Sequence, residues 1–195
     1  LTIAPLVSKT FSSMYDSIQV SNELSKFAFD NNLADVAKSF LKVEKDNLLV
    51  RGLGLRIDFP KDNRNSYGWH QDNAYDKFNL YSKNGVILWV PLIDTNEENG
   101  TLIIKPGSQN SSFNCSRLIK NGSKYKSKQI IVMKKYLKKY TSKSISVKKN
   151  SSLATYSGIF HKSGKNSSDQ IRFTIVTRYN NLFSKDFLYY RNLKK

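Results

Sequence analysis

The sequence predicts a mainly β fold, a sandwich or barrel of short strands, with helices at its N-terminus. The first 45 residues place apolar side chains at helical spacing, whereas from Asn47 onward short β-rich runs are separated by turn signals. Many short strands divided by tight turns are typical of β-sandwiches and barrels. With 195 residues, of which 39% are hydrophobic, the chain is expected to form one domain with a buried core.

The N-terminal segment, residues 1–46, is expected to be helical. Its apolar residues recur at helical intervals on both sides of a break at Asn31-Asn32. They are Phe11, Met14, Tyr15, Ile18, Leu24, Phe27 and Phe29, followed by Leu33, Val36, Ala37, Phe40 and Leu41.

The predicted strands fall within residues 47–180. They are 48–59, 67–75, 86–92, 101–104, 144–147, 153–156 and 171–179. The turn signals are Asn84-Gly85, Asn99-Gly100, Pro106-Gly107, Asn121-Gly122 and Ser163-Gly164. A basic insertion of about 109–143 interrupts the series, and residues 130–140 within it are expected to form a short amphipathic helix. Residues 181–195 are expected to form a C-terminal tail.

The net charge of +17 is concentrated in one third of the chain. Between Asn99 and Ser168 there are 15 Lys or Arg and no Asp or Glu, and the density is highest from Arg117 to Lys149. A basic surface of this kind binds nucleic acid, anionic membranes or acidic substrates. Lysine dominates over arginine and no pattern of stacking aromatics accompanies it, which favours a solvated lysine face instead.

The remaining composition favours a cytoplasmic protein. The one cysteine, Cys115, is expected in a loop and cannot form an internal disulfide. No apolar stretch reaches the length of a membrane span, and the first residues lack the charged leader of a signal peptide. Because the sequence begins at Leu1 and not at Met, we expect a processed or truncated N-terminus.

Both histidines of the chain stand where a metal site would need them. His70 and Asp72 form a His-x-Asp element, and His161 follows 89 residues after Asp72. If 67–75 is a strand, positions 70 and 72 face the same side and can reach one ion. Two imidazoles and one carboxylate on one face of a metal mark non-haem Fe(II) oxygenases. Such triplets also occur by chance, so two ordinary histidines near loop ends are the alternative at this point.

The segments around these residues follow the order of a known family. They are Gly68-Trp69-His70-Gln71-Asp72, residues 88–94, residues 99–108, residues 161–168 and Arg172. Together they closely resemble the phytanoyl-CoA dioxygenase family, part of the Fe(II)/2-oxoglutarate oxygenases, over about residues 48–180. The resemblance implies a double-stranded β-helix, a cupin-like jelly roll, with the leading helices packed on its outside.

The resemblance also implies a role for each matching residue. The implied iron ligands are His70, Asp72 and His161, and the implied 2-oxoglutarate-binding residues are Arg172, Gln71, Trp89 and Ser163. Arg172 matches the residue that binds the distal carboxylate, a role that suits a guanidinium because it pairs with a carboxylate through two hydrogen bonds. For Trp89, a core aromatic of strand 86–92 is an equally good interpretation.

These matches imply a hydroxylase that uses Fe(II), 2-oxoglutarate and O2, acts on an aliphatic C–H bond, and releases succinate and CO2. Related halogenases replace the carboxylate ligand by a small residue, so Asp72 favours hydroxylation. Two departures affect no implied ligand but leave the branch of the family open. Gln109 stands where the family often has His, and Lys149-Asn150 where it usually has Gly-Asp.

The sequence leaves the substrate open. Candidates to contact it flank the metal motif: Tyr67, Trp69, Asn73 and Tyr75. The basic insertion, placed as a lid, would favour a small anionic substrate such as a carboxylated metabolite or an acyl thioester. There are two alternative functions. One is a noncatalytic jelly roll that binds nucleic acid or anionic lipid on its basic face, and the other is a cupin-like isomerase that uses another metal. The complete triad together with Arg172 argues against both.

Overall fold

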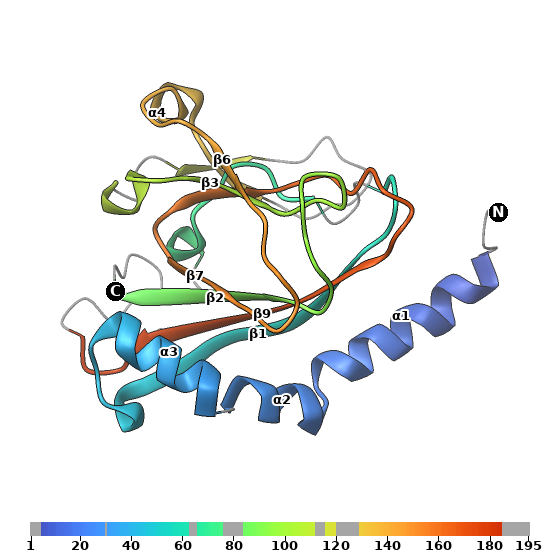
Figure 1. The fold of residues 1–195 in the computed structure, drawn as a ribbon, viewed down its shortest axis with the longest axis horizontal. Helices are drawn as coiled ribbons and strands as arrows, with labels where there is room; N and C mark the ends of the chain where they lie inside the picture. Colours follow the sequence, from blue (N-terminus) through green and yellow to red (C-terminus); the bar gives the residue numbers. More distant parts are fainter. Residues whose placement is uncertain are drawn as a thin grey trace.

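The computed structural model describes residues 5–29, 31–62, 66–75, 84–111, 116–119 and 129–184. Within these ranges, helices at the N-terminus lie against a β structure of two facing sheets (Figure 1). The mainly β class with N-terminal helices, predicted from the sequence, is confirmed. Cys115, much of the basic insertion and most of the C-terminal tail lie outside the described residues.

The N-terminal segment folds into α1 (Pro5–Gln19), α2 (Asn22–Phe29) and α3 (Asn31–Leu41). The sequence predicted the start of α3 but not the break between α1 and α2. At that break the Ser21 hydroxyl accepts a hydrogen bond of 3.2 Å from the Leu24 backbone N–H. Serine is a favoured residue ahead of a helix because it satisfies such an otherwise unpaired donor.

Two antiparallel sheets form the jelly roll. The larger contains, in spatial order, β1 (Leu48–Asp58), β9 (Arg172–Asn181), β2 (Gly85–Pro91) and β7 (Leu153–Tyr156). The smaller contains β6 (Lys143–Ile145), β3 (Leu102–Lys105) and β8 (Phe160–Ser163). A separate ribbon pairs β4 (Ser116–Ile119) with β5 (Gln129–Val132), and the short helix α4 (Lys134–Leu137) follows it.

Two expectations about individual elements are wrong. The stretch 67–75 is not a strand: it makes one isolated bridge, His70 to His161, and then turns into a 3₁₀ helix at Asp72–Ala74. Asp and Asn favour such turns because their short side chains compete with regular ladders. The predicted helix 130–140 is a strand up to Val132 and helical only over Lys134–Leu137.

An extra residue in β1 decides which side chains face the site. The pairing of β1 with β9 shifts between Val50 and Gly52, as in a β-bulge. The apolar residues before and after the bulge therefore pack together against the helices; they are Leu48, Val50, Leu53 and Leu55. Even-numbered positions after the bulge, such as Arg56, face the space between the sheets.

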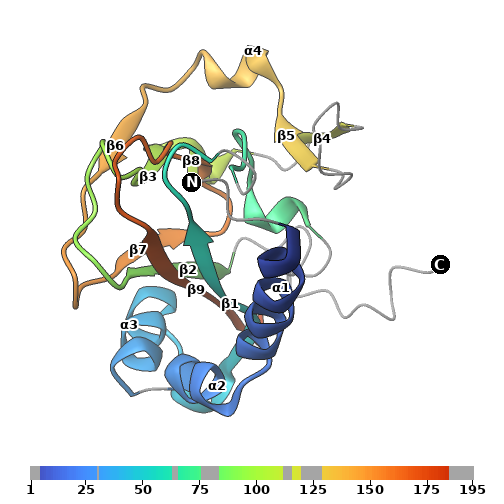
Figure 2. The same cartoon turned by 90° about the vertical axis from the view of Figure 1, so that its right-hand side faces the viewer.

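Apolar side chains fill the molecule on both sides of the larger sheet. One cluster lies between that sheet and α2 and α3, and it includes Leu88 and Tyr179. A second lies between the two sheets, with Trp89 of the larger facing Ile104 of the smaller. Figure 2 shows this order of layers: helices, larger sheet, smaller sheet. None of the helices in the described ranges is long and apolar enough to cross a membrane.

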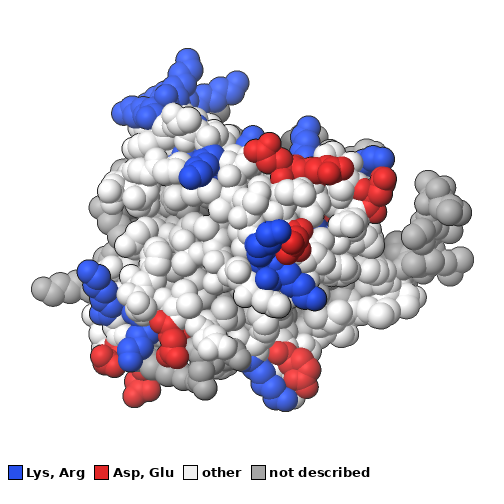
Figure 3. Space-filling view, viewed as in Figure 1, with Lys and Arg blue, Asp and Glu red and all other residues white. Residues whose placement is uncertain are grey.

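The lysines of α4 and its surroundings are exposed at one edge of the molecule. Lys134, Lys135, Lys138 and Lys139 are all exposed, and this edge appears as a group of basic side chains in Figure 3, at the place where Figure 1 shows α4. Lys135 and Lys139 lie over the Tyr136 ring.

Candidate active site

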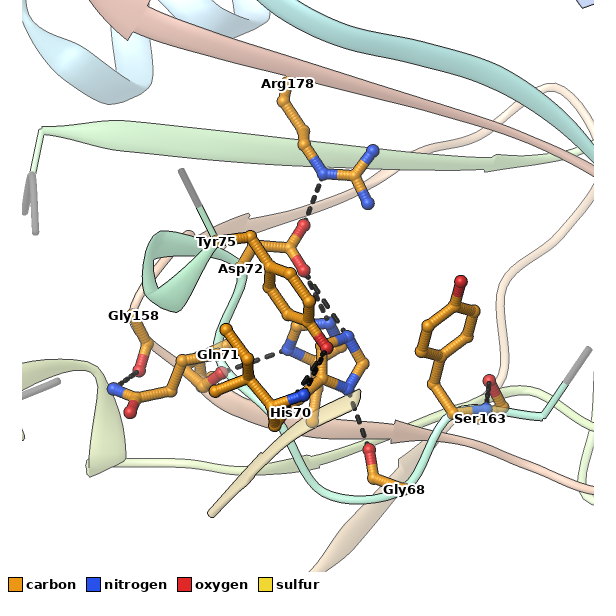
Figure 4. A network of polar contacts seen from close by, with 12 residues as sticks. Gly68, His70, Gln71, Asp72, Tyr75, Gly158, Ser163 and Arg178 are labelled. Carbon is orange, nitrogen blue, oxygen red and sulfur yellow. Dashed lines mark hydrogen bonds and ion pairs between the residues drawn. The ribbon is translucent and has the colours of Figure 1, made fainter. Parts of the chain in front are cut away.

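Three side chains from separate segments converge between the sheets. His161 lies in β8, and its backbone forms the bridge to His70, with hydrogen bonds of 2.9 and 3.1 Å. Asp72 begins the adjacent 3₁₀ turn, so its carboxylate points back to both rings (Figure 4). Its Oδ1 lies 3.4 Å from His70 Nε2 and 3.5 Å from His161 Nε2. One ligand atom from each residue lies within 4.8 Å of the others, and all three residues are buried.

Both imidazoles are oriented by the main chain. His70 Nδ1 lies 2.7 Å from the Gly68 carbonyl and His161 Nδ1 lies 3.0 Å from the Ile159 carbonyl. A carbonyl only accepts, so Nδ1 of each ring carries a proton, and Nε2 is the ring nitrogen that faces Asp72 and could bind a metal. Burial, then the neighbouring His161, lower the pKa of His70 and keep it neutral. The Nε2 lone pair of neutral His70 and the Asp72 carboxylate repel each other, and a bound cation would remove that repulsion. The three residues therefore fit a metal ion.

Arg178 of β9 holds the other oxygen of the carboxylate. Its Nε donates to Asp72 Oδ2, which leaves Oδ1 toward the histidines (Figure 4). Burial alone would raise the pKa of Asp72, but the neighbouring Arg178 charge holds that pKa well below its ordinary value. Asp72 is thus ionised, as a metal ligand must be.

A second arginine of the same strand is buried deeper in the site. Arg172 Nη2 lies 2.8 Å from Asp58 Oδ2, and its Nη1 donates to the Asn99 carbonyl at 3.1 Å. Its guanidinium lies 5.9 Å from the centre of the Trp89 ring. Burial lowers the pKa of Arg172, and the ion pair with Asp58 opposes that shift. The Nε of Arg172 is buried and has no hydrogen-bond partner among the described residues, so a bound acceptor could become its partner.

Two adjoining pockets open from the cluster. The first has an empty volume of about 510 Å³ including its mouth, and polar groups line it beside the cluster: Thr101, Thr155, Ser163 and Arg172. We name it the cosubstrate pocket after the ligand that the sequence resemblance leads us to expect there. The second, which we name the α1 chamber, has about 770 Å³ and extends beneath Tyr15 and Gln19 of α1. Arg56 and Arg178 line both pockets, together with His70 and Asp72.

The residues expected from the sequence are distributed unevenly around these pockets. Trp89 and Ser163 line the cosubstrate pocket, and Tyr67 and Tyr75 line the α1 chamber. The other three line neither pocket; they are Gln71, Trp69 and Asn73.

These three have other partners. Gln71 is fully buried and braces the backbone, since its amide donates to the Gly158 carbonyl at 3.0 Å and accepts from the Ser116 hydroxyl at 2.9 Å. Trp69 packs beside Val132 and lies under the ammonium groups of two lysines. Asn73 is buried next to Gly158.

Sequence reasoning missed several residues of the site: Tyr15, Gln19, Arg56, Asp58 and Arg178. Alternation along β9 could have pointed to Arg178, because positions 172, 174, 176 and 178 share one face of a strand. Nothing in the sequence indicated that α1 would lie over the site, since that depends on how the helices pack.

The jelly roll and its buried His-Asp-His cluster define the class of cupin-like proteins with a two-histidine, one-carboxylate metal site. Within it, the chain belongs to the phytanoyl-CoA dioxygenase (PhyH) family, whose model matches residues 4–174. The resemblance seen in the sequence is thus confirmed. No sequence among curated proteins matches the chain significantly.

Solved structures share the fold at low sequence identity. EvdO2 from Micromonospora carbonacea var. aurantiaca, complexed with 2-oxoglutarate, is 17% identical with a TM-score of 0.67, over 82% of this chain and 63% of its own. The epimerase SnoN, in complex with Fe3+, alpha ketoglutarate and nogalamycin RO, is 18% identical with a TM-score of 0.64, over 85% and 61%. EctD from S. alaskensis, with 2-oxoglutarate and 5-hydroxyectoine, is 18% identical with a TM-score of 0.64, over 84% and 54%. The chain spans less than two thirds of each.

Proposed function

We propose that the protein is an Fe(II)- and 2-oxoglutarate-dependent dioxygenase that hydroxylates an aliphatic C–H bond of a small substrate, with release of succinate and CO2. One observation carries the proposal: the Nε2 atoms of His70 and His161 and Oδ1 of Asp72 converge, beside a pocket that contains Arg172. Membership of the family and the iron and 2-oxoglutarate bound in its structural neighbours support it.

The three converging residues would hold the iron. Fe(II), when bound, supplies the centre at which O2 is activated and the cosubstrate is oxidatively decarboxylated. The chain keeps each ligand in its coordinating form: backbone carbonyls fix the proton on Nδ1 of both histidines, and Arg178 turns one oxygen of Asp72 away. These contacts preorganise the ligands before a metal binds.

Arg172 would bind the distal carboxylate of 2-oxoglutarate. Within the part of the chain that the structure describes, its Nε has no hydrogen-bond partner, and Ser163, Thr101 and Thr155 line the same pocket. Trp89 forms an apolar wall against the guanidinium and excludes water from it. A desolvated guanidinium binds a carboxylate more strongly than an exposed one does.

Asp72 also bears on the kind of reaction. A halogenase of this class needs a coordination position that a carboxylate ligand would fill. Asp72 points its Oδ1 at both histidines, and this supports hydroxylation as the outcome of turnover.

A spectroscopic experiment tests the proposal without knowledge of the substrate. Anaerobic addition of Fe(II) and 2-oxoglutarate is expected to produce a weak visible charge-transfer band, and aerobic incubation is expected to release succinate slowly. His70→Ala and His161→Ala should lose both signals. Asp94→Asn removes an exposed carboxylate that lines neither pocket, and should keep them. A band that survives in either histidine variant would exclude the ligand assignment.

A further inference from the structure

We infer that the α1 chamber is the substrate site and that it binds an amide of the substrate, a primary carboxamide or a lactam, through the main chain of Leu53. The inference rests on the proposed function, because metal chemistry at His70 and Asp72 is what would make a ligand in this chamber a substrate. It depends on the position of the chamber, on the outer edge of β1, and on an amide that the chain itself binds at that edge.

The α1 chamber lies beside the metal cluster but apart from the arginine expected to hold 2-oxoglutarate. His70 and Asp72 line both pockets, whereas Arg172 lines the cosubstrate pocket alone. A ligand in the chamber would therefore lie beside the metal ligands while Arg172 holds the cosubstrate. The empty volume of the chamber, about 770 Å³ with part of it open to solvent, is in the range of small-molecule sites.

One wall of the chamber is the outer edge of β1, beside which α1 lies (Figure 2). This strand is at one end of the order β1-β9-β2-β7, so that among the described strands it has a neighbour on one side only. The N–H and C=O of Leu55 point to the outer edge, where they pair with Gln19. Backbone groups alternate in direction along a strand, and the pairing with β9 is regular over residues 52–58. The N–H and C=O of Leu53, two residues earlier, therefore point to the same edge.

The contact between Gln19 and Leu55 shows which chemical group fits this edge. The Gln19 side-chain amide donates to the Leu55 carbonyl at 2.9 Å and accepts from the Leu55 N–H at 3.0 Å. A primary amide can do both at one residue because its N–H and C=O lie side by side. A lactam has the same arrangement, whereas the N–H and C=O of a trans peptide bond point in opposite directions.

Leu53 offers the same two groups one step further along the edge, about 7 Å from Leu55 at about 3.4 Å per residue. Within the part of the chain that the structure describes, its N–H and C=O make no hydrogen bond at this edge. Its side chain packs with the apolar cluster on the helix side of the sheet, so it is the main chain of Leu53 that lines the chamber. The open edge of a strand binds ligands through such main-chain groups.

The residues on both sides of Leu53 leave room for a ligand. They are Gly52 and Gly54, and both line the chamber. Glycine within a strand is typical of places where a ligand or another chain segment approaches the backbone closely. At Gly54 that close approach is already made by α1, because a Cβ there would lie 3.2 Å from Gln19 Oε1.

Aromatic rings connect this edge with the metal cluster. Tyr67 and Tyr75 line the chamber, and the centres of their rings lie 5.5 and 6.2 Å from that of His70. The Tyr75 hydroxyl pairs with the main chain of Ile130, at 3.0 Å to its N–H and 3.3 Å to its C=O. An amide held at Leu53 would thus leave the rest of the ligand to pack against these rings, beside His70.

A titration followed by NMR tests the inference. The full chain is loaded with 2-oxoglutarate and with Zn2+, which is diamagnetic and does not turn over. The ligands are 2-piperidone, a six-membered lactam, and cyclohexanone, which has the same ring and carbonyl but no N–H. Bound 2-piperidone should shift the amide signal of Leu53 and slow its exchange with solvent, and it should bind about five- to tenfold more tightly than cyclohexanone.

Leu53→Pro removes the N–H at the edge, a change that an edge strand tolerates where the N–H does not pair with its neighbour. Leu53→Ala is the matched control, because it loses the same side chain but keeps the N–H. The lactam should bind about five- to tenfold more weakly to the Pro variant than to the Ala variant. Equal affinities of the two variants would overturn the inference.

If Leu53→Pro does not fold, the Leu53 signal of the unmodified chain decides. A signal that stays in place at saturating 2-piperidone refutes the inference. A Leu53 N–H that is already protected from exchange without ligand also refutes it, because another part of the chain then occupies the edge.

The same titrations separate this inference from the proposed function. Failure of 2-oxoglutarate to bind the Zn2+ protein, with the lactam response at Leu53 intact, would contradict the proposed function and leave the amide site standing. Normal binding of 2-oxoglutarate without a response at Leu53 would overturn the inference alone.

Discussion

Replacing Asp58 by Asn should cost a large part of the stability of the fold. The substitution keeps the shape of the side chain but removes the charge that balances Arg172. Both groups are buried, with side-chain exposures of 8% for Asp58 and 4% for Arg172, and their charged atoms are 2.8 Å apart. At a separation of about 4 Å between charge centres and an effective dielectric constant of about 20, the lost attraction is about 4 kcal/mol. Loss of one partner of a buried pair typically costs about 3–5 kcal/mol.

Urea unfolding followed by tryptophan fluorescence measures this loss. Thermal unfolding should show the same loss, because for a chain of this size about 4 kcal/mol corresponds to a fall of about 8–16 °C in Tm. Asp169→Asn is the control, because it removes a carboxylate from an ion pair with Lys61 whose side chains are 92% and 72% exposed, and such pairs contribute little. The double variant of Asp58→Asn with Arg172→Gln should lose less than the sum of the single losses. If Asp58→Asn is no less stable than Asp169→Asn, the account of the buried pair is wrong.

Three further predictions concern single contacts. Ser108→Ala should lower the free energy of unfolding by about 1–3 kcal/mol, because the Ser108 hydroxyl accepts a 2.8 Å hydrogen bond from the buried Phe160 N–H; urea unfolding checks this, and an unchanged midpoint would contradict it. Gly100→Ala should lower the free energy of unfolding by about 2 kcal/mol or more, because φ is +83° and a Cβ would lie 2.5 Å from Arg172 Nη1. In Gly107→Ala φ is also positive, at +87°, but the added Cβ would meet no atom closer than 3.7 Å. The difference between the two variants therefore measures the steric contribution to the loss. Burial raises the pKa of the Tyr15 hydroxyl above 10.0, so the hydroxyl keeps its proton to higher pH in the native state than in the unfolded chain. The resulting stability is complete below pH 10.0 and should be lost as the pH rises through the pKa of Tyr15 in the folded protein. Tyr15→Phe should show a shallower alkaline loss in pH-dependent unfolding, and equal slopes would refute the assignment.

Most of the fold could be predicted because the local signals and the final structure agree. Leu153–Tyr156 is a strand over the residues expected from the sequence. β1 differs from its expected range by one residue at its end, and β2 by one residue at each end. Where tertiary contacts decide the structure, the expectations fail. Ile130 and its neighbours suit a helix or a strand, and the hydrogen bonds of Ile130 with the Tyr75 hydroxyl belong to a strand arrangement that no short-range pattern reveals.

His70 and Asp72 converge although the strand expected over residues 67–75 does not form. The sequence argument placed His70 and Asp72 on one face of a strand, yet Asp72 lies in a 3₁₀ turn. The two residues meet because the bridge to His161 fixes the His70 backbone and the turn that follows brings the carboxylate back. Motif order identified which residues converge. It could not identify Asp58 or Arg178, whose roles depend on strand register.

Strand register explains how β1 and β9 build the charged end of the site together. Asp58 lies directly opposite Arg172, and Gly52 lies opposite Arg178. Facing residues on one side of an antiparallel pair are close enough to interact, so the first pairing sets a carboxylate against a guanidinium and the second gives Arg178 room to extend to Asp72. A shift of one residue would turn all of these side chains to the helix side and bring leucines into the site. Arg51 is the extra residue of the bulge, since Val50 pairs with Tyr179 and Gly52 with Arg178. The bulge therefore lets the apolar residues before it and those after it face the same side of the sheet. The position of the charges therefore depends on one extra residue in an edge strand, outside the motifs that first indicated the site.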